Sequence, residues 1–243
     1  MKKIHHLASL ATAAVAFCAA LTACGEEAPA LTSPCAVVVD GSGSGTRLDA
    51  ARLLREHLAD FLYAKGCATL AFSPITGASE STKCNYPNVD LDPAAVPGAD
   101  VTALRRRAYK QAEKTAADVL DCAKKEGATE APGSDVLGGI SKAVGTRPEG
   151  TGAYHILVIS DFAQSDSTVD LYHDSLAPAD REMIIARLNA KARIPDLSGT
   201  TITYYGFGAG YAPSQAGRVA LLRAFWAELV TGPGHGTAPV QGN

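Results

Sequence analysis

The sequence predicts an α/β domain with a doubly wound, mainly parallel central sheet, helices on both faces and a short antiparallel edge strand. The first observation is that short apolar runs rich in β-branched residues alternate with segments whose apolar residues recur every three or four positions. The second is that these runs are continuously apolar, as in strands buried on both faces. The third is that 243 residues are enough for one sizeable domain with its own core.

The first half of the domain shows two strands separated by a helix. Residues 36–39 are a β-branched apolar run, and residues 48–61 carry an apolar stripe at helical spacing, with Gly66 as the expected C-cap. Residues 67–72 are the second strand. A Ser/Thr-rich turn then leads to the short edge strand, which we expect near residues 82–84.

The middle of the chain begins with a loop and continues as helix. Residues 85–100 are rich in Pro, Asp and Asn and are expected to form a loop, whereas residues 101–125 are helical in composition and end before Gly127. A second glycine-bearing loop leads to Ser134. Serine is a good N-cap residue, so a short helix is expected to start there.

The last part of the domain repeats the strand–helix alternation. Residues 155–160 are the most apolar strand of the chain, and residues 180–192 form a helix. Residues 201–207 are a further strand, and Ser214 caps a last helix with an apolar stripe. Residues 233–243, rich in Gly and Pro, are expected to be a flexible tail.

The amino terminus has the pattern of an export signal. Lys2 and Lys3 precede an uncharged apolar stretch, residues 7–21, which is short for a spanning helix. The stretch ends in Leu-Thr-Ala-Cys24, which resembles a bacterial lipobox. This predicts a signal peptide over 1–23, lipidation of Cys24 and a tether to residue 34, with the domain held on the extracytoplasmic face of the cell membrane. An ordinary secretory signal is the alternative, and it also places the domain outside the cytoplasm.

The cysteines are consistent with export. Of six, Cys18 lies in the expected signal and Cys24 at its end, which leaves an even number in the domain. Two disulfides are expected in an oxidising compartment, and no C-x-x-C motif favours a metal cluster instead. Four cysteines allow three pairings. A tight hairpin around Ile75 favours the pair Cys67–Cys84, which leaves Cys35–Cys122 as the second.

Polar side chains gather where two predicted strands end. Asp40, Ser42 and Ser44 follow the first strand with glycines between them, and Asp161 ends the strand over 155–160. Ser134 lies at a loop-to-helix junction. In a doubly wound sheet these segments meet at the carboxyl edge, where ligands bind. Carboxylate and hydroxyl oxygens are ligands for a hard cation, so we expect Mg²⁺, or Mn²⁺ or Ca²⁺, at this edge.

The pattern Asp40-x-Ser42-x-Ser44 after an apolar strand resembles the D-x-S-x-S signature of von Willebrand factor A (VWA), or integrin I-type, domains, which have a Rossmann-like fold. Their metal-ion-dependent adhesion site adds a threonine from a second loop and an aspartate from a later strand, positions that match Ser134 and Asp161 here. The resemblance covers about residues 35–232. It implies a metal-binding module that recognises a protein partner through an acidic side chain of that partner, and it does not imply an enzyme.

This sequence departs from the family pattern at two places. Serine stands for threonine at position 134, which keeps the hydroxyl. Phe162 follows Asp161 where the family usually has glycine, which is expected to reshape the loop above the site.

Two other functions remain open on the same residues. A metal-assisted hydrolase is the first, although the sequence offers no evident general base. A metal-free scaffold that binds through its loops, above all residues 85–100, is the second. Nucleic acid is excluded as a partner because the net charge is −3 and no basic surface is predicted. A dinucleotide loop is excluded because Thr46 occupies the position of the third glycine.

Overall fold

The computed structural model describes residues 30–43, 47–93, 99–129 and 133–242. Within them the chain is an α/β domain with a six-stranded, mostly parallel sheet, as predicted. The expected signal peptide, the lipidation site Cys24 and the metal-ligand candidate Ser44 lie outside the described residues.

The sheet has the strand order β3-β2-β1-β4-β5-β6. The strands are β1 (Ser33–Asp40), β2 (Cys67–Ile75), β3 (Val89–Asp90), β4 (Tyr154–Ile159), β5 (Thr200–Tyr205) and β6 (Val240–Gln241). Only β3 is antiparallel to its neighbour; the other pairs are parallel. The chain builds the sheet outward from β1 in one direction and then returns to add β4 on the other side. The direction of winding therefore changes between β1 and β4.

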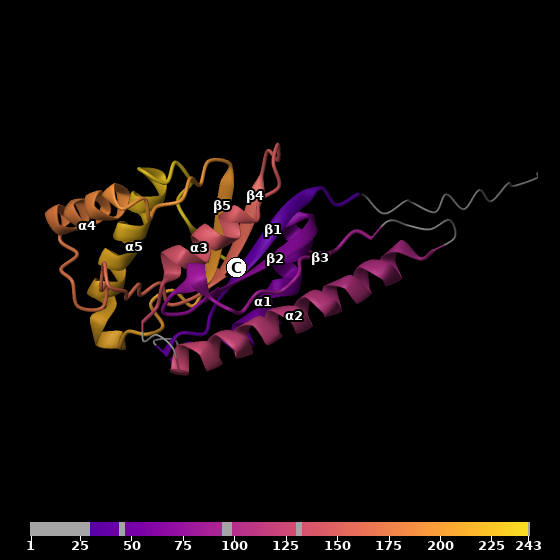
Figure 1. Ribbon diagram of the computed structural model, residues 1–243, viewed down its shortest axis with the longest axis horizontal. Helices are drawn as coiled ribbons and strands as arrows, with labels where there is room; N and C mark the ends of the chain where they lie inside the picture. The colour runs from indigo at the N-terminus through magenta and orange to yellow at the C-terminus, as the bar shows by residue number, and fades with distance from the viewer. Residues whose placement is uncertain (1–29, 44–46, 94–98, 130–132, 243) are drawn as a thin grey trace, which may run out of the picture.

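Helices cover both faces of the sheet (Figure 1). They are α1 (Ala50–Lys65), α2 (Val101–Thr129), α3 (Val136–Gly145), α4 (Pro178–Ala190) and α5 (Ala216–Thr231), with 3₁₀ turns at η2 (Ser79–Ser81) and η3 (Pro213–Gln215). One hydrophobic core joins α1 and α2 to the sheet, and a second joins α3, α4 and α5 to the opposite face. Both cores are built from the described residues.

The position of β1 between two helical layers explains why its sequence is continuously apolar. Ala36 and Val38 face the core under α3 and α5, whereas Val37 and Val39 face the core under α1 and α2. All four are fully buried. Because successive side chains of a strand point to opposite faces, a strand between two helical layers needs an apolar residue at every position.

Several predicted boundaries differ from the structure. The antiparallel edge strand is β3, inside the segment predicted as a loop, and not residues 82–84, where Thr82 Oγ1 instead donates a hydrogen bond of 2.7 Å to Glu126. Helix α2 continues through Gly127 to Thr129. The N-cap of α3 is Asp135, which accepts from Gly138 N at 2.9 Å, and not Ser134. The segment expected to be a flexible tail contains β6, which pairs with β5.

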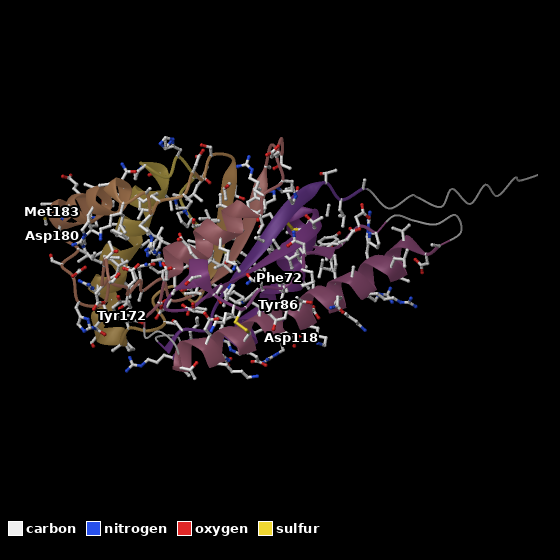
Figure 2. All side chains as sticks on the ribbon, viewed as in Figure 1. Phe72, Tyr86, Asp118, Tyr172, Asp180 and Met183 are labelled. Carbon is white, nitrogen blue, oxygen red and sulfur yellow. A yellow bond between two sulfur atoms is a disulfide. The ribbon has the colours of Figure 1, made fainter. Side chains whose placement is uncertain are left out.

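The structure has two disulfides, but the predicted pairing was wrong. Cys35 pairs with Cys67, and Cys84 pairs with Cys122, with Cα–Cα distances of 5.7 and 5.8 Å. The predicted hairpin around Ile75 does not exist, because Ile75 is the last, fully buried residue of a strand that runs parallel to β1. The first disulfide joins these two neighbouring strands. The second attaches the loop after β2 to α2, beside Tyr86 and Asp118 (Figure 2).

Among the described residues, no helix combines the length and the apolar character that crossing a membrane requires.

Candidate metal centre

The candidate site lies where the winding of the sheet changes direction. Asp40 is the last residue of β1, and Asp161 comes two residues after the end of β4. The two strands are adjacent and parallel, with Val39 opposite Ile159. In open α/β sheets ligands bind in the crevice beyond the carboxyl ends of two such strands, because the loops that follow them turn to opposite faces. The fold therefore places both aspartates at the favoured position for a ligand.

Asp40 is held by hydroxyl groups from both sides. Its Oδ1 accepts from the backbone N–H of Ser42 at 3.0 Å and from the Ser42 hydroxyl at 2.6 Å. Its Oδ2 accepts from the Ser160 hydroxyl at 2.7 Å. Ser160 in turn accepts from Phe162 N at 2.9 Å. Ser160 was not among the predicted site residues; its position directly before Asp161 is the sequence signal that identifies it.

Asp161 is fully buried and fixed by the loop that follows it. Its Oδ1 accepts from Ala163 N at 2.9 Å, and its Oδ2 accepts from the Tyr172 hydroxyl at 2.6 Å. A Cβ atom at Gly210 would lie 2.2 Å from that Oδ2, so the close approach requires glycine there. Tyr172 (labelled in Figure 2) and Gly210 were not predicted, because nothing local in the sequence links them to Asp161.

Burial raises the pKa of both carboxylates. Burial, followed by the negative charge of Asp161, raises the pKa of Asp40 from 3.8 to about 6, against the opposing effect of its hydrogen bonds to Ser42 and Ser160. Burial also raises the pKa of Asp161, opposed by the hydrogen bonds from Tyr172 and Ala163. Both shifts mean that negative charge at this edge of the sheet is costly without a compensating cation.

Ser134 reaches the same edge from another loop. Its backbone forms two hydrogen bonds with Ser165, from Ser134 N to Ser165 O at 2.7 Å and from Ser165 N to Ser134 O at 2.9 Å. These bonds tie the Ser134 loop to the loop that carries Asp161. The Ser134 side chain is completely buried, and its hydroxyl has no hydrogen-bond partner within the described part of the chain. A buried hydroxyl without a partner costs about 1–3 kcal/mol, so it calls for an explanation.

Phe162 adopts the backbone conformation that glycine favours. Its φ is 61°, in the left-handed region. The turn after Asp161 therefore has a left-handed residue at position 162, and phenylalanine occupies it in place of the glycine that this conformation favours. Its ring is fully buried and packs edge-on against Trp226, whose indole N–H donates to Phe162 O at 2.9 Å. Packing stabilises a conformation that is unfavourable for a residue with a side chain.

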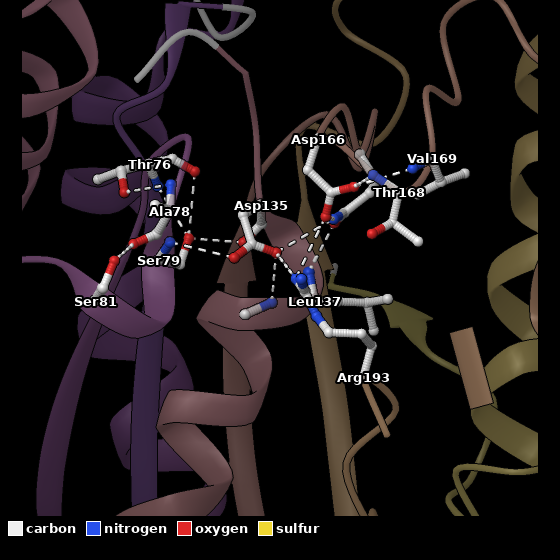
Figure 3. A network of polar contacts seen from close by, with 12 residues as sticks. Thr76, Ala78, Ser79, Ser81, Asp135, Leu137, Asp166, Thr168, Val169 and Arg193 are labelled. Atoms are coloured by element: carbon white, nitrogen blue, oxygen red, sulfur yellow. Dashed lines mark hydrogen bonds and ion pairs between the residues drawn. The ribbon is translucent and has the colours of Figure 1, made fainter. Parts of the chain in front are cut away.

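A second polar network surrounds Asp135, the residue after Ser134 (Figure 3). Asp135 and Asp166 both accept hydrogen bonds from Arg193, at 2.7 and 3.3 Å, and from Gln164, at 3.2 and 2.8 Å. The side-chain oxygen of Gln164, Oε1, accepts a hydrogen bond from Leu137 N at 2.8 Å. The network thus connects the start of α3 to the loop after β4. It was not predicted, since Arg193 follows α4 and is distant in sequence from both acids.

The donor set fits a hard cation. No group of three or more His, Cys, Asp or Glu side chains that could hold a metal occurs in residues 30–242 as far as they are described. A cation here would instead take carboxylate and hydroxyl oxygens, with water completing its coordination, as Mg²⁺ does. The structure brings Asp40, Ser42 and Asp161 to one edge and connects the Ser134 loop to that edge through Ser165.

Fold and site together define an α/β domain with a carboxylate- and hydroxyl-lined edge at the point where its sheet changes winding direction. No protein-family model matches the sequence. A search of curated proteins found no match either.

Proposed function

We propose that the chain is a VWA-like module that binds a divalent cation, Mg²⁺ or similar, through Asp40, Ser42, Ser44, Ser134 and Asp161. The cation would recognise a protein partner by binding an acidic side chain of that partner. The observation that carries the proposal is the buried Ser134 hydroxyl, which lacks a hydrogen-bond partner in the described part of the chain. A cation would give this oxygen a partner, because a hydroxyl lone pair can bind a hard cation as well as accept a hydrogen bond.

The electrostatics support the same proposal. Asp40 and Asp161 are buried and repel each other, and a divalent cation between their loops would compensate both charges. The described residues at this edge supply oxygen ligands and hydrogen bonds. We propose a binding module in preference to a metal-assisted hydrolase because the resemblance to VWA domains implies recognition of a partner.

We further propose that the module is anchored to the extracytoplasmic face of a bacterial membrane through a lipid on Cys24. Support comes from the lipobox-like sequence and from the disulfides, which are typical of exported proteins. The described chain enters the sheet at Ser33, the first residue of β1, and Asp40 is the last residue of that strand. The tether and the candidate site thus lie at opposite ends of the strand, so the site is at the end of β1 that is farther from the proposed anchor.

Metal titration of two serine variants tests the proposed site. The protein is the chain over residues 25–243, which contains both cores and both disulfides. Calorimetric Mg²⁺ and Mn²⁺ affinities are compared for wild type and Ser134→Ala, which should bind at least about tenfold more weakly. Ser73→Ala is the matched control, because Ser73 is equally buried but its hydroxyl donates to Gly139 O at 2.7 Å, away from the site.

The two variants should have opposite effects. Ser134→Ala weakens metal binding and leaves the metal-free stability unchanged or higher, because it removes an unpartnered polar group. Ser73→Ala lowers stability and leaves metal affinity unchanged. Equal metal affinity in wild type and Ser134→Ala, or no metal binding by the wild type at millimolar concentrations, would overturn the proposed site.

A further inference from the structure

A groove at the end of the molecule opposite the candidate metal centre has no role in the proposed metal binding. It lies between the C-terminal end of α1, the start of α2 and the residues just before β1, and its volume is about 990 Å³. We call it the basic groove. Its lining includes Leu31, Tyr63, Ala64, Arg106, Tyr109 and Lys110.

The basic groove carries positive charge on a chain that is negative overall. Lys65, Arg105, Arg106 and Lys110 line it, with Glu113 as the acidic residue of the lining. Arg105 pairs with the neighbouring Asp92 at 2.7 Å, so among the described lining residues the other three cations stand against one carboxylate. The formal net charge of the chain is −3, so this local excess is not a property of the whole surface. The charge of the groove is complementary to an anionic partner.

The groove also presents apolar and aromatic surface between these charges. Tyr63 projects from α1 with 81% of its surface exposed, although large apolar side chains are usually buried. Leu31, Ala64 and Tyr109 extend the apolar lining. A tyrosine combines an apolar ring with a polar hydroxyl, and such side chains favour the boundary between lipid and water. A basic rim around aromatic and aliphatic side chains therefore suits a phospholipid surface.

The position of the basic groove along the chain points to the same partner. Ala30 and Leu31, the first described residues, line it. Cys24 precedes Ala30 by six residues, and a chain of six residues spans at most about 20 Å. The amino-terminal end of α2 lies at this same end of the molecule (Figure 1). If Cys24 is lipidated, the edge of the groove at Ala30 is held within that distance of the bilayer.

We propose that the basic groove is a membrane-contact surface that binds anionic phospholipid headgroups, with Arg106 and Lys110 on the phosphates and the Tyr63 ring at the lipid–water boundary. The location of this surface near a membrane rests on the proposed lipid anchor; its binding of anionic lipid does not. Contact at this end fixes the orientation of the domain, so that the candidate metal centre points outward. A flexible tether alone leaves that orientation undefined.

Vesicle binding by the unacylated chain tests the surface separately from the anchor. Residues 25–243 are co-sedimented with vesicles of phosphatidylcholine alone and with vesicles containing phosphatidylglycerol, in EDTA and at low salt. The wild type should prefer the anionic vesicles. Arg106→Glu combined with Lys110→Glu should weaken that binding at least about tenfold, since each basic residue near an anionic surface contributes about 1 kcal/mol. Tyr63→Ala should weaken it severalfold on the same vesicles.

The matched control uses the other end of the same helix. Lys124→Glu combined with Lys125→Glu makes the same change in net charge on exposed residues of α2, near its C-terminal end. It should leave vesicle binding close to that of the wild type. The inference is overturned if the wild type binds neutral and anionic vesicles equally, or if the control loses as much binding as the groove variant. Vesicle binding without any metal affinity would sustain the groove and overturn the metal proposal.

Discussion

Neutralising Asp40 should stabilise the metal-free domain while abolishing its metal binding. Asp40→Asn keeps the size and shape of the side chain and removes its charge. In the folded protein the pKa of Asp40 is raised from 3.8 to about 6, mainly by burial and then by Asp161. The charged form is therefore less favourable in the folded state than in the unfolded chain.

The magnitude follows from this rise in pKa. At about 1.4 kcal/mol per pKa unit, a rise from 3.8 to about 6 corresponds to about 3 kcal/mol. A carboxyl group with a raised folded pKa contributes stability below pH 3.8, and this contribution is lost as the pH rises through about 6. Asparagine has no such cost. In the wild type the Ser160 hydroxyl donates to Asp40 Oδ2, whereas in the variant it faces the amide N–H of asparagine and that hydrogen bond is lost or reversed. The expected net gain in the free energy of unfolding is therefore about 2 kcal/mol near neutral pH.

Denaturant unfolding in EDTA measures this gain. Near neutral pH, Asp40→Asn should unfold at higher denaturant concentration than the wild type, and at about pH 4 the difference should become small. Added Mg²⁺ should stabilise the wild type and not the variant. Asp196→Asn is the control, because hydrogen bonds from Ser198 lower the pKa of this exposed carboxyl and no gain is expected. A variant less stable than the wild type in EDTA near neutral pH, or a difference independent of pH, would refute the reasoning.

Other perturbations test the remaining parts of the site and fold. Mg²⁺ affinity measured by calorimetry should fall about tenfold between neutral pH and pH 5, because protonated Asp40 cannot bind a cation. Phe162→Gly should lower the free energy of unfolding by about 2–4 kcal/mol, since the buried ring is worth more than relief of its positive φ. Replacing both Cys84 and Cys122 by Ala should lower the free energy of unfolding by about 2–4 kcal/mol. A non-reducing peptide map of the wild type should show the Cys84–Cys122 disulfide. Arg193→Met should destabilise the fold by about 3–5 kcal/mol by leaving two buried carboxylates without their cation. A stability equal to the wild type in any of the last three would contradict the corresponding contact.

The strands and helices were largely predictable because their signals are local. The run at 36–39 predicted β1 because a strand between two helical layers must be apolar at every position. Gly66 predicted the end of α1 because the left-handed C-cap, here with φ of 59°, favours glycine. In the same way Asp40 and Asp161 were predictable candidates, since polar residues at the ends of apolar runs are visible in the sequence.

Features that depend on contacts between distant segments were not predictable. The disulfide pairing was wrong because it assumed a local hairpin at Ile75, whereas Cys35 and Cys67 are brought together by parallel strand pairing. The edge strand was misplaced because β3 has only two residues and forms through its bonds to β2. A two-residue strand has no periodicity of its own to detect.

The sequence by itself determined the α/β class, the order of most elements and the acidic strand ends, because each of these rests on residues that are neighbours along the chain. Only the tertiary structure decided which cysteines pair, that Tyr172 donates to Asp161, and that Arg193 bridges Asp135 and Asp166. It also decided that the Ser134 hydroxyl is buried and has no hydrogen-bond partner among the described residues. Burial and pairing between segments are set by the packing of the whole sheet and its helices, and no local pattern encodes them.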